Sequence, residues 1–342
     1  MAASLPLLLH GAPGSPYTRK MLAVLRYKRV AYRLLSPAQA KANGLPQPPV
    51  ALLPTFYFPD ADGGYQPAVD STPLIRRLDR DYAARPVVEA APLVAIIDAL
   101  IEDYADEWMT KMMFHYRWHF AADAEKAAQI LVRHGNTVGA DEEFARLAKM
   151  FGDRQIGRLS YVGSNEITAP VIEASFVRFL DIFENMLAQS RFVFGDKPCA
   201  ADFALYGQLT QLAHFDPTPL ALTLARAKRI FAWVDDMEDL SGLDDAAPIV
   251  AVPASVGPLL AEIGRVYAPV MLGNEKALVA GQTTFSCEVD GRAWTQNCFP
   301  YHRKCLAVLR GLFAGLGNSD RGACLELARV AGLEEVLAAG GD

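Results

Sequence analysis

Ser15 stands at the start of a predicted helix, where a small hydroxyl is well placed to assist a reaction. The apolar run Leu5–Leu9 predicts a short buried strand, and Gly11–Gly14, with two glycines and a proline, predicts a sharp turn after it. Ser15 followed by Pro16 is typical of a helix N-cap and first helical position. The exposed N–H groups and the dipole at such an end favour an anion such as a thiolate. The alternative, that Ser15 only caps the helix, stays open.

Several further elements must lie around this turn to make a site. The chain predicts a second strand at Val30–Leu35 and a proline-rich loop at Ser36–Val50 that permits only a short, interrupted helix. A strand follows at Leu52–Phe58 and is joined to a return strand at Gln66–Val69 through the turn Asp62-Gly63-Gly64-Tyr65. Asp70-Ser71-Thr72-Pro73 is another helix start. The order is strand, helix, strand, irregular helix, hairpin and helix.

Three short motifs in this order carry a resemblance to a known family. They are Pro13-Gly14-Ser15-Pro16-Tyr17-Thr18-Arg19, then Leu53-Pro54-Thr55, and then Asp70-Ser71 with Ile75. Together they resemble the activating residue, the cis-proline step and the acidic-Ser pair of the glutathione transferase superfamily. The resemblance implies an α/β thioredoxin-like N-terminal domain and an all-α C-terminal domain. It covers about residues 5–245 and leaves a C-terminal extension with a β-hairpin and helices.

The domain limits that we expect follow from this resemblance and from the composition. Residues 1–82 form the thioredoxin-like, glutathione-binding domain, and residues 83–92 (AARPVVEAAP) form the linker. Residues 93–245 form the helical domain, which begins with a long amphipathic helix over 93–120. Residues 246–342 form the extension.

The resemblance assigns the site residues. Ser15 is the expected catalytic residue, because its hydroxyl would bond the glutathione sulfur and lower the pKa of the thiol. A cis bond between Leu53 and Pro54 would present the Leu53 backbone to the cysteinyl unit. Ser71 would hold the γ-glutamyl carboxylate at a helix N-terminus, with Asp70 near the α-ammonium. The alternatives are that Pro54 begins a strand in trans and that Asp70 or Ser71 only caps a helix.

Other polar residues near this site are weaker candidates. Tyr17 offers a second hydroxyl in the same turn, ranked below Ser15. The glycyl carboxylate of glutathione has no clear partner, and Lys41 and Asn43 are candidates by position only. Relatives with a Cys at the activating position favour thiol exchange. Because this chain has Ser15 there, we do not expect a glutaredoxin-like activity.

In the helical domain, Cys199 and Asp202 resemble the family's capping box, with Cys199 where a Ser or Thr is usual. Their role would be structural. His115 and His119 lie one helical turn apart, but no carboxylate or Cys in the sequence pattern completes a metal site with them. We therefore expect two core or rim histidines.

The extension predicts a hairpin over Thr283–Asn297 around Asp290-Gly291. In that register Val289 faces Arg292, Cys287 faces Trp294 and Phe285 faces Gln296. Helices are predicted over 256–280, from Tyr301 and over 325–337. Four side chains here offer a zinc hypothesis, namely Cys287, Cys298, His302 and Cys305, but their spacing matches no established finger. Buried thiols are the favoured interpretation, and no metal is expected.

Composition narrows the class of protein. The chain has 342 residues, a net charge of −6 and about half apolar residues, which suits two domains with an additional piece. No basic block indicates a nucleic-acid or anionic membrane partner, and no apolar run approaches the roughly 20 residues of a membrane span. Five cysteines predict reduced thiols rather than a disulfide framework. We expect a cytoplasmic protein.

The functional prediction is a glutathione transferase-like enzyme. It would activate glutathione, as co-substrate, for attack on a small hydrophobic electrophile, as in detoxification. Two alternatives stay open. One is a non-catalytic protein of the same fold that serves binding or assembly, and the other is a glutathione-dependent isomerase, dehalogenase or etherase. The family implies a homodimer, although the extension could cover or remodel that surface.

Overall fold

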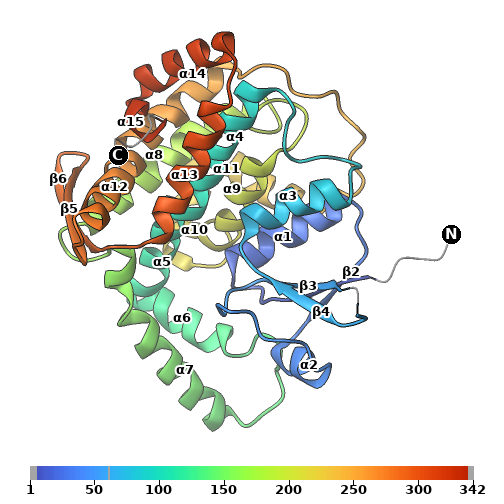
Figure 1. Ribbon diagram of the computed structural model, residues 1–342. Helices are drawn as coiled ribbons and strands as arrows, with labels where there is room; N and C mark the ends of the chain where they lie inside the picture. The colour runs from blue at the N-terminus through green and yellow to red at the C-terminus, as the bar shows by residue number, and fades with distance from the viewer. Residues whose placement is uncertain (1–5, 61, 338–342) are drawn as a thin grey trace.

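The computed structural model describes residues 6–60 and 62–337, so Leu5, at the start of the first predicted strand, lies outside the described residues. The N-terminal part is a four-stranded sheet with helices on both faces (Figure 1). Its elements are β1 (Leu7–His10), α1 (Pro16–Tyr27), β2 (Tyr32–Leu35), α2 (Pro37–Ala42), β3 (Thr55–Pro59), β4 (Tyr65–Ala68) and α3 (Ser71–Asp81). The order and type of the predicted elements are confirmed.

The sheet has the strand order β2-β1-β3-β4, in which β1 runs parallel to β2 and antiparallel to β3. Both of its faces are covered. Leu7, Leu9 and Phe56 belong to the main hydrophobic core with α1 and α3, whereas Leu8 and Tyr57 pack with residues of α2 and its flanks. Burial on both faces explains why the two central strands, β1 and β3, are nearly continuous apolar runs.

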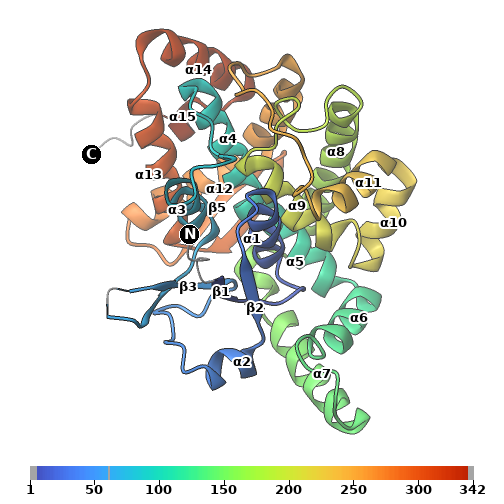
Figure 2. The same ribbon diagram turned by 90° about the vertical axis from the view of Figure 1, so that its right-hand side faces the viewer.

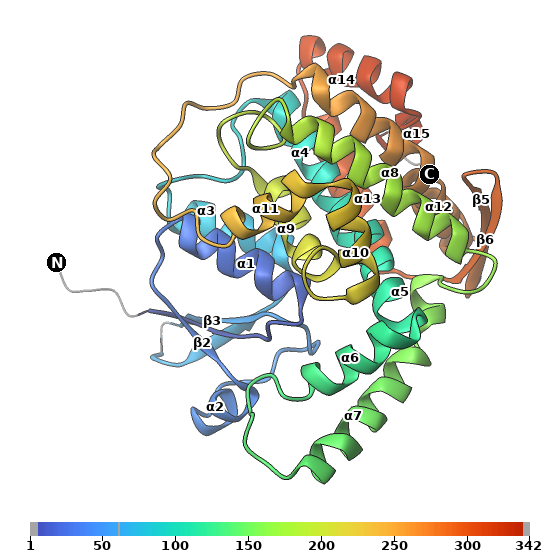
Figure 3. The same ribbon diagram turned by 180° about the vertical axis from the view of Figure 1, so that it is seen from behind.

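The helical part wraps around α9, a helix in which every residue is buried. Its elements are α4 (Pro92–Tyr104), a π-helical segment η1 (Ala105–Met109), α5 (Thr110–His119), α6 (Ala121–Leu131), α7 (Asp141–Ile156), η2 (Leu159–Val162), α8 (Ala169–Leu187), α9 (Ala200–Leu212), α10 (Pro217–Arg226) and α11 (Lys228–Met237). At Gly207 of α9 an added Cβ would lie 2.6 Å from the carbonyl oxygen of Pro16. Glycine therefore permits the close approach of α9 to α1. The pair α6–α7 projects from the body of the molecule (Figures 2 and 3).

The long helix predicted over 93–120 is present but not uniform. Residues 105–109 widen into one π-helical turn between α4 and α5. Such segments occur frequently at functional sites, because the extra residue re-aims the side chains that follow. α10 was not among the predicted helices. The capping expectation at α9 is confirmed for the carboxylate, since Asp202 accepts hydrogen bonds from the backbone N–H groups of Cys199 and Val193.

The extension lies against α4 and α8 and joins the same hydrophobic core (Figures 1 and 3). It comprises η3 (Ala254–Val256), α12 (Gly257–Val279), β5 (Thr284–Val289), β6 (Arg292–Asn297), α13 (Tyr301–Ala314), α14 (Asn318–Ala331) and α15 (Glu334–Leu337). The predicted hairpin register is confirmed at all three pairs. Trp294 of the hairpin packs 5.3 Å from Trp108, ring centroid to ring centroid. The predicted last helix, over 325–337, is wrong in its limits, because Gly332, at φ 72°, ends α14 in a left-handed turn.

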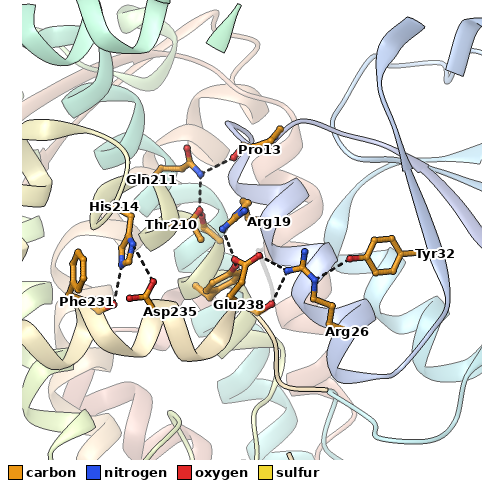
Figure 4. A network of polar contacts seen from close by, with 12 residues as sticks. Pro13, Arg19, Arg26, Tyr32, Thr210, Gln211, His214, Phe231, Asp235 and Glu238 are labelled. Atoms are coloured by element: carbon orange, nitrogen blue, oxygen red, sulfur yellow. Dashed lines mark hydrogen bonds and ion pairs between the residues drawn. The ribbon is translucent and has the colours of Figure 1, made fainter. Parts of the chain in front are cut away.

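An ionic network joins the first helix to the helical part (Figure 4). Glu238, directly after α11, pairs with Arg19 and, at 2.6 Å, with Arg26 of α1. Tyr206 of α9 donates to the same carboxylate. These contacts fix α1, and with it the turn that carries Ser15, against the helices that face it. No helix among the described residues is long and apolar enough to cross a membrane.

Candidate active site

The predicted turn before α1 holds Ser15 at the helix N-terminus. Its Oγ accepts a hydrogen bond from the Thr18 N–H at 3.2 Å and donates to the Leu53 carbonyl oxygen at 3.4 Å. Arg117 of α5 donates to the Gly14 carbonyl at 3.1 Å and braces the turn from the helical part. Ser15 is thus a helix cap, and it also lies beside the backbone that was predicted to share its site. The bond to Leu53 is long, so this hydroxyl proton is weakly held.

The Leu53–Pro54 peptide bond is cis. Both residues line a cavity of about 620 Å³. Asp70 and Ser71 also line that cavity, whereas Ser15 is not among its lining residues. The structure therefore brings four of the five predicted site residues to one cavity. The fifth, Ser15, does not line the cavity but is hydrogen-bonded to Leu53, which does.

Asp70 precedes α3 with φ 80° and ψ 112°, a conformation that costs a non-glycine residue about 1–3 kcal/mol. Its carboxylate makes no capping hydrogen bond to α3. Instead, Oδ2 accepts a hydrogen bond of 2.6 Å from the hydroxyl of Tyr301, the first residue of α13 in the extension. The alternative that Asp70 only caps a helix does not describe this geometry, and the extension reaches a residue expected to bind glutathione.

Ser71 is buried at the first position of α3 and rests on a buried ion cluster. Its Oγ accepts a hydrogen bond from Lys20 Nζ at 3.1 Å and donates to Asp106 Oδ2 at 3.4 Å. Lys20 also pairs with Asp106 at 2.6 Å and with Glu102 at 2.8 Å. Burial alone would lower the pKa of Lys20, but Asp106 and Glu102 outweigh it and raise that pKa above its ordinary value. The lysine therefore stays charged beneath the N-terminus of α3.

Three parts of the chain surround the cavity. The N-terminal part supplies Tyr17 and the residues around Pro54 and Ser71. The helical part supplies an acidic row from the α4–η1–α5 helix, together with Tyr161 and Val162 of η2. The extension supplies residues 296–299 with Tyr301 and His302. Sequence reasoning missed this third wall, because the hairpin's pairing pattern gives no sign of what its end faces.

The acidic row has altered titration. Burial raises the pKa of Asp103, Asp106 and Glu107 to about 7 each. Burial lowers the pKa of Lys111 to about 8. The Oε2 atom of Glu107 lies 3.1 Å from the Nε2 atom of His302. Carboxyl groups with a pKa near neutrality can give or take a proton, so this wall is suited to general acid–base chemistry.

The weaker candidates lie in other surroundings. The hydroxyl of Tyr17 donates to the Asp106 carbonyl at 2.7 Å, and burial raises its pKa well above the ordinary value. Asn43 caps α2 by donating to the Gln39 carbonyl at 2.7 Å, and neither it nor Lys41 lines the cavity. Of the residues that do line it, Lys111 supplies a cation, and its Nζ donates to Gln296 Oε1 at 3.1 Å.

The cysteines and histidines group differently from the zinc hypothesis. All five cysteines are free thiols, as predicted. Among the described residues, Cys305 groups with Asp103 and Glu107, not with Cys298 or Cys287. The expectation that no carboxylate joins His115 and His119 is wrong, because Glu173 of α8 lies beside them. That contact joins two helices far apart in the sequence and has no local signal.

Comparisons with known proteins agree with this architecture. Residues 9–86 match the family model of the glutathione S-transferase N-terminal domain, and residues 138–236 match that of the C-terminal domain. The two matches together span just over half of the chain. A search of curated proteins finds no match.

Three solved structures with some likeness to the chain comprise two named glutathione transferases and one β-etherase. Poplar glutathione transferase F1 has 18% identity and a TM-score of 0.38, over 68% of this chain and 92% of its own. A glutathione transferase from Pseudomonas putida, solved with glutathione disulfide bound, has 14% identity and a TM-score of 0.41, over 69% and 88%. The β-etherase LigF from Sphingobium sp. strain SYK-6 has 16% identity and a TM-score of 0.47, over 72% and 97%.

Proposed function

Because the chain belongs to the glutathione S-transferase superfamily, we propose that it binds glutathione and activates the thiol for attack on a small electrophile. The observation that carries the proposal is that the cis Leu53–Pro54 step and the Asp70–Ser71 pair line one cavity, with Ser15 hydrogen-bonded to Leu53. In the proposed complex the cysteinyl backbone pairs with Leu53. The γ-glutamyl group lies at the N-terminus of α3, with its carboxylate at Ser71 and its ammonium at Asp70.

The reaction follows from the position of Ser15. Its hydroxyl proton, now shared with the Leu53 carbonyl at 3.4 Å, turns to the glutathione sulfur and stabilises the thiolate, while the thiol proton passes to solvent water. The thiolate forms a bond to the electrophilic carbon, and the leaving group or the opened ring takes the electron pair. Glu107 or Asp103, with a pKa of about 7, then returns a proton where the product needs one.

Calorimetric titration of glutathione tests the proposal. The wild type binds, and Ser71→Ala weakens binding because the γ-glutamyl carboxylate loses a donor. Ser15→Ala retains binding but raises the pKa of the bound thiol, which is followed by thiolate absorbance against pH. Ser36→Ala is the matched control, since Ser36 caps α2 in the same Ser-Pro setting but, unlike Ser15, is not hydrogen-bonded to a residue that lines the cavity. Absence of wild-type binding refutes the enzyme proposal.

A second function is favoured by a specific observation. The Asp70 carboxylate is already bonded by Tyr301, and the Ser71 hydroxyl by Lys20. A protein of this fold that no longer binds glutathione, and instead uses the extension for binding or assembly, would tolerate both contacts. Glutathione titrations that show no binding in the wild type and none in Tyr301→Phe would favour this second function.

The remaining expectations belong to the same proposal. The second substrate is a small hydrophobic electrophile in a detoxification reaction, and isomerisation, dehalogenation or ether cleavage with glutathione stay as alternatives that product analysis separates. A cytoplasmic location follows from dependence on glutathione and is tested by fractionation. A homodimer is tested by light scattering, with a monomer as the result to be expected if the extension covers the family's dimer surface.

A further inference from the structure

A second cluster of chemically capable side chains lies outside the cavity, where the C-terminal end of α5 meets α8. It consists of His115 and His119 on α5 and Glu173 on α8. One ligand atom from each of the three lies within 4.8 Å of the other two. Figure 3 shows α5 and α8 on the same side of the molecule. None of the three residues lines the cavity of the proposed active site.

His115 has the arrangement that proteins give to a metal ligand. Its side chain is fully buried, and its Nδ1 is hydrogen-bonded to Ser164 Oγ at 2.8 Å. The other ring nitrogen, Nε2, is buried without a hydrogen-bond partner among the described residues. Metal-binding histidines are usually held in this way, with the second nitrogen bonded and the first directed at the ion. A buried nitrogen without a partner is otherwise a cost to the fold.

The distances suit a first-row divalent ion. His115 Nε2 lies 3.4 Å from Glu173 Oε1. Two ligands bonded at about 2.0–2.1 Å to a tetrahedral zinc ion lie about 3.3 Å apart. The rings of His115 and His119 are stacked, with centroids 4.6 Å apart and planes 22° from parallel, so both can present a nitrogen to the same side. His119 is exposed and Glu173 is partly exposed, so small side-chain rotations complete the geometry.

The donor set also suits coordination. The buried imidazole of His115 offers Nε2 as a ligand atom, because its Nδ1 is already bonded to Ser164. Glu173 offers a negative charge to balance the ion. Imidazole with one carboxylate is a common donor set for Zn²⁺ and neighbouring divalent metals.

We propose that His115, His119 and Glu173 bind one divalent transition-metal ion, with water completing the coordination. Zn²⁺ is the ion that this donor set favours. The ion bridges α5 to α8 and stabilises the folded chain. Because the site does not share residues with the cavity, the proposal does not depend on glutathione binding.

The test uses the full chain after removal of metals with a chelator. Zn²⁺ titrated into it by calorimetry is expected to bind one ion per chain and to raise the Tm. His119→Ala and Glu173→Gln are each expected to weaken binding at least tenfold. Both changes are at the surface, so the variants should fold. His214→Ala, at a half-buried histidine beside Asp235, is the control and should bind like the wild type.

Two results would overturn the proposal. One is an absence of stoichiometric Zn²⁺ binding in the wild type. The other is equal binding by the wild type, His119→Ala and Glu173→Gln. In that second case, a loss of binding in Cys305→Ser would assign the ion to the group of Asp103, Glu107 and Cys305.

Discussion

Replacing Lys20 with Met should destabilise the protein in a way that depends on pH. Lys20 has 1% of its side chain exposed, and its ammonium is bonded to Asp106 and Glu102, which are themselves buried. Removing one partner of a buried ion pair leaves the other charge without compensation and costs about 3–5 kcal/mol. With about 2 °C of Tm per kcal/mol for a chain of this size, the Tm should fall by roughly 6–10 °C.

The pH dependence of this loss follows from protonation of Asp106, which has lost its cationic partner in the variant. Burial already raises the pKa of Asp106 to about 7, and without Lys20 its pKa rises further. At pH 5.5 the Asp106 carboxyl group is protonated, so the loss of stability is small. At pH 8 it is charged and unpaired, so the full loss of stability is expected. Thermal unfolding at the two pH values measures the difference.

Two further variants separate charge from packing. Lys149→Met removes a lysine that pairs with Asp153 at 2.7 Å on the surface, and it should leave the Tm within about 2 °C of the wild type. Adding Asp106→Asn to Lys20→Met should restore part of the stability at pH 8. An equal loss at both pH values, with no recovery from the second substitution, would refute the reasoning and assign the effect to the lysine's alkyl chain.

Three other predictions concern the extension and the acidic row. Tyr301→Phe removes the donor that holds Asp70 and should lower glutathione affinity about tenfold in calorimetry, since a hydrogen bond to a charged group is worth about 1.5–3 kcal/mol. Asp103→Asn should gain stability relative to the wild type in melts as pH rises from 5 to 8, because burial raises the Asp103 pKa to about 7, above its value in the unfolded chain. Gly264→Ala should cost about 1–3 kcal/mol in urea unfolding, because its Cβ would lie 1.7 Å from a backbone oxygen of α14. Gly311→Ala, also in a helix but with open space around it, should be neutral or gain up to about 1 kcal/mol.

Each of these predictions has a result that contradicts it. Unchanged affinity in Tyr301→Phe would mean that Asp70 does not need the extension to be held in place. A constant difference between Asp103→Asn and the wild type across the pH range would mean that this carboxyl does not titrate near 7 in the folded chain. Equal stability of the two glycine variants would mean that α12 and α14 can separate without cost.

The sequence by itself determined the local elements and the order in which they come. The Ser15-Pro16 helix start, the turn at Asp62–Gly64 and the hairpin around Asp290-Gly291 depend on residues within a few positions of one another, so their spacing is enough to predict them. The hairpin register was correct at every predicted pair for this reason. The limits of the last helix were wrong because Gly332, a residue inside an apolar pattern, ends α14.

Only the tertiary structure decided which side chains surround these elements. Tyr301 reaches Asp70 across 231 positions of sequence, and Lys20 reaches Ser71 across 51. Glu173 meets the α5 histidines in the same way, from a helix that no local pattern relates to theirs. Burial, which sets the pKa of Asp103 and its neighbours, is also a property of the packed chain. The turn with Ser15 could therefore be read from nearby residues, whereas the chemistry of its surroundings depends on contacts that form only when distant segments pack together.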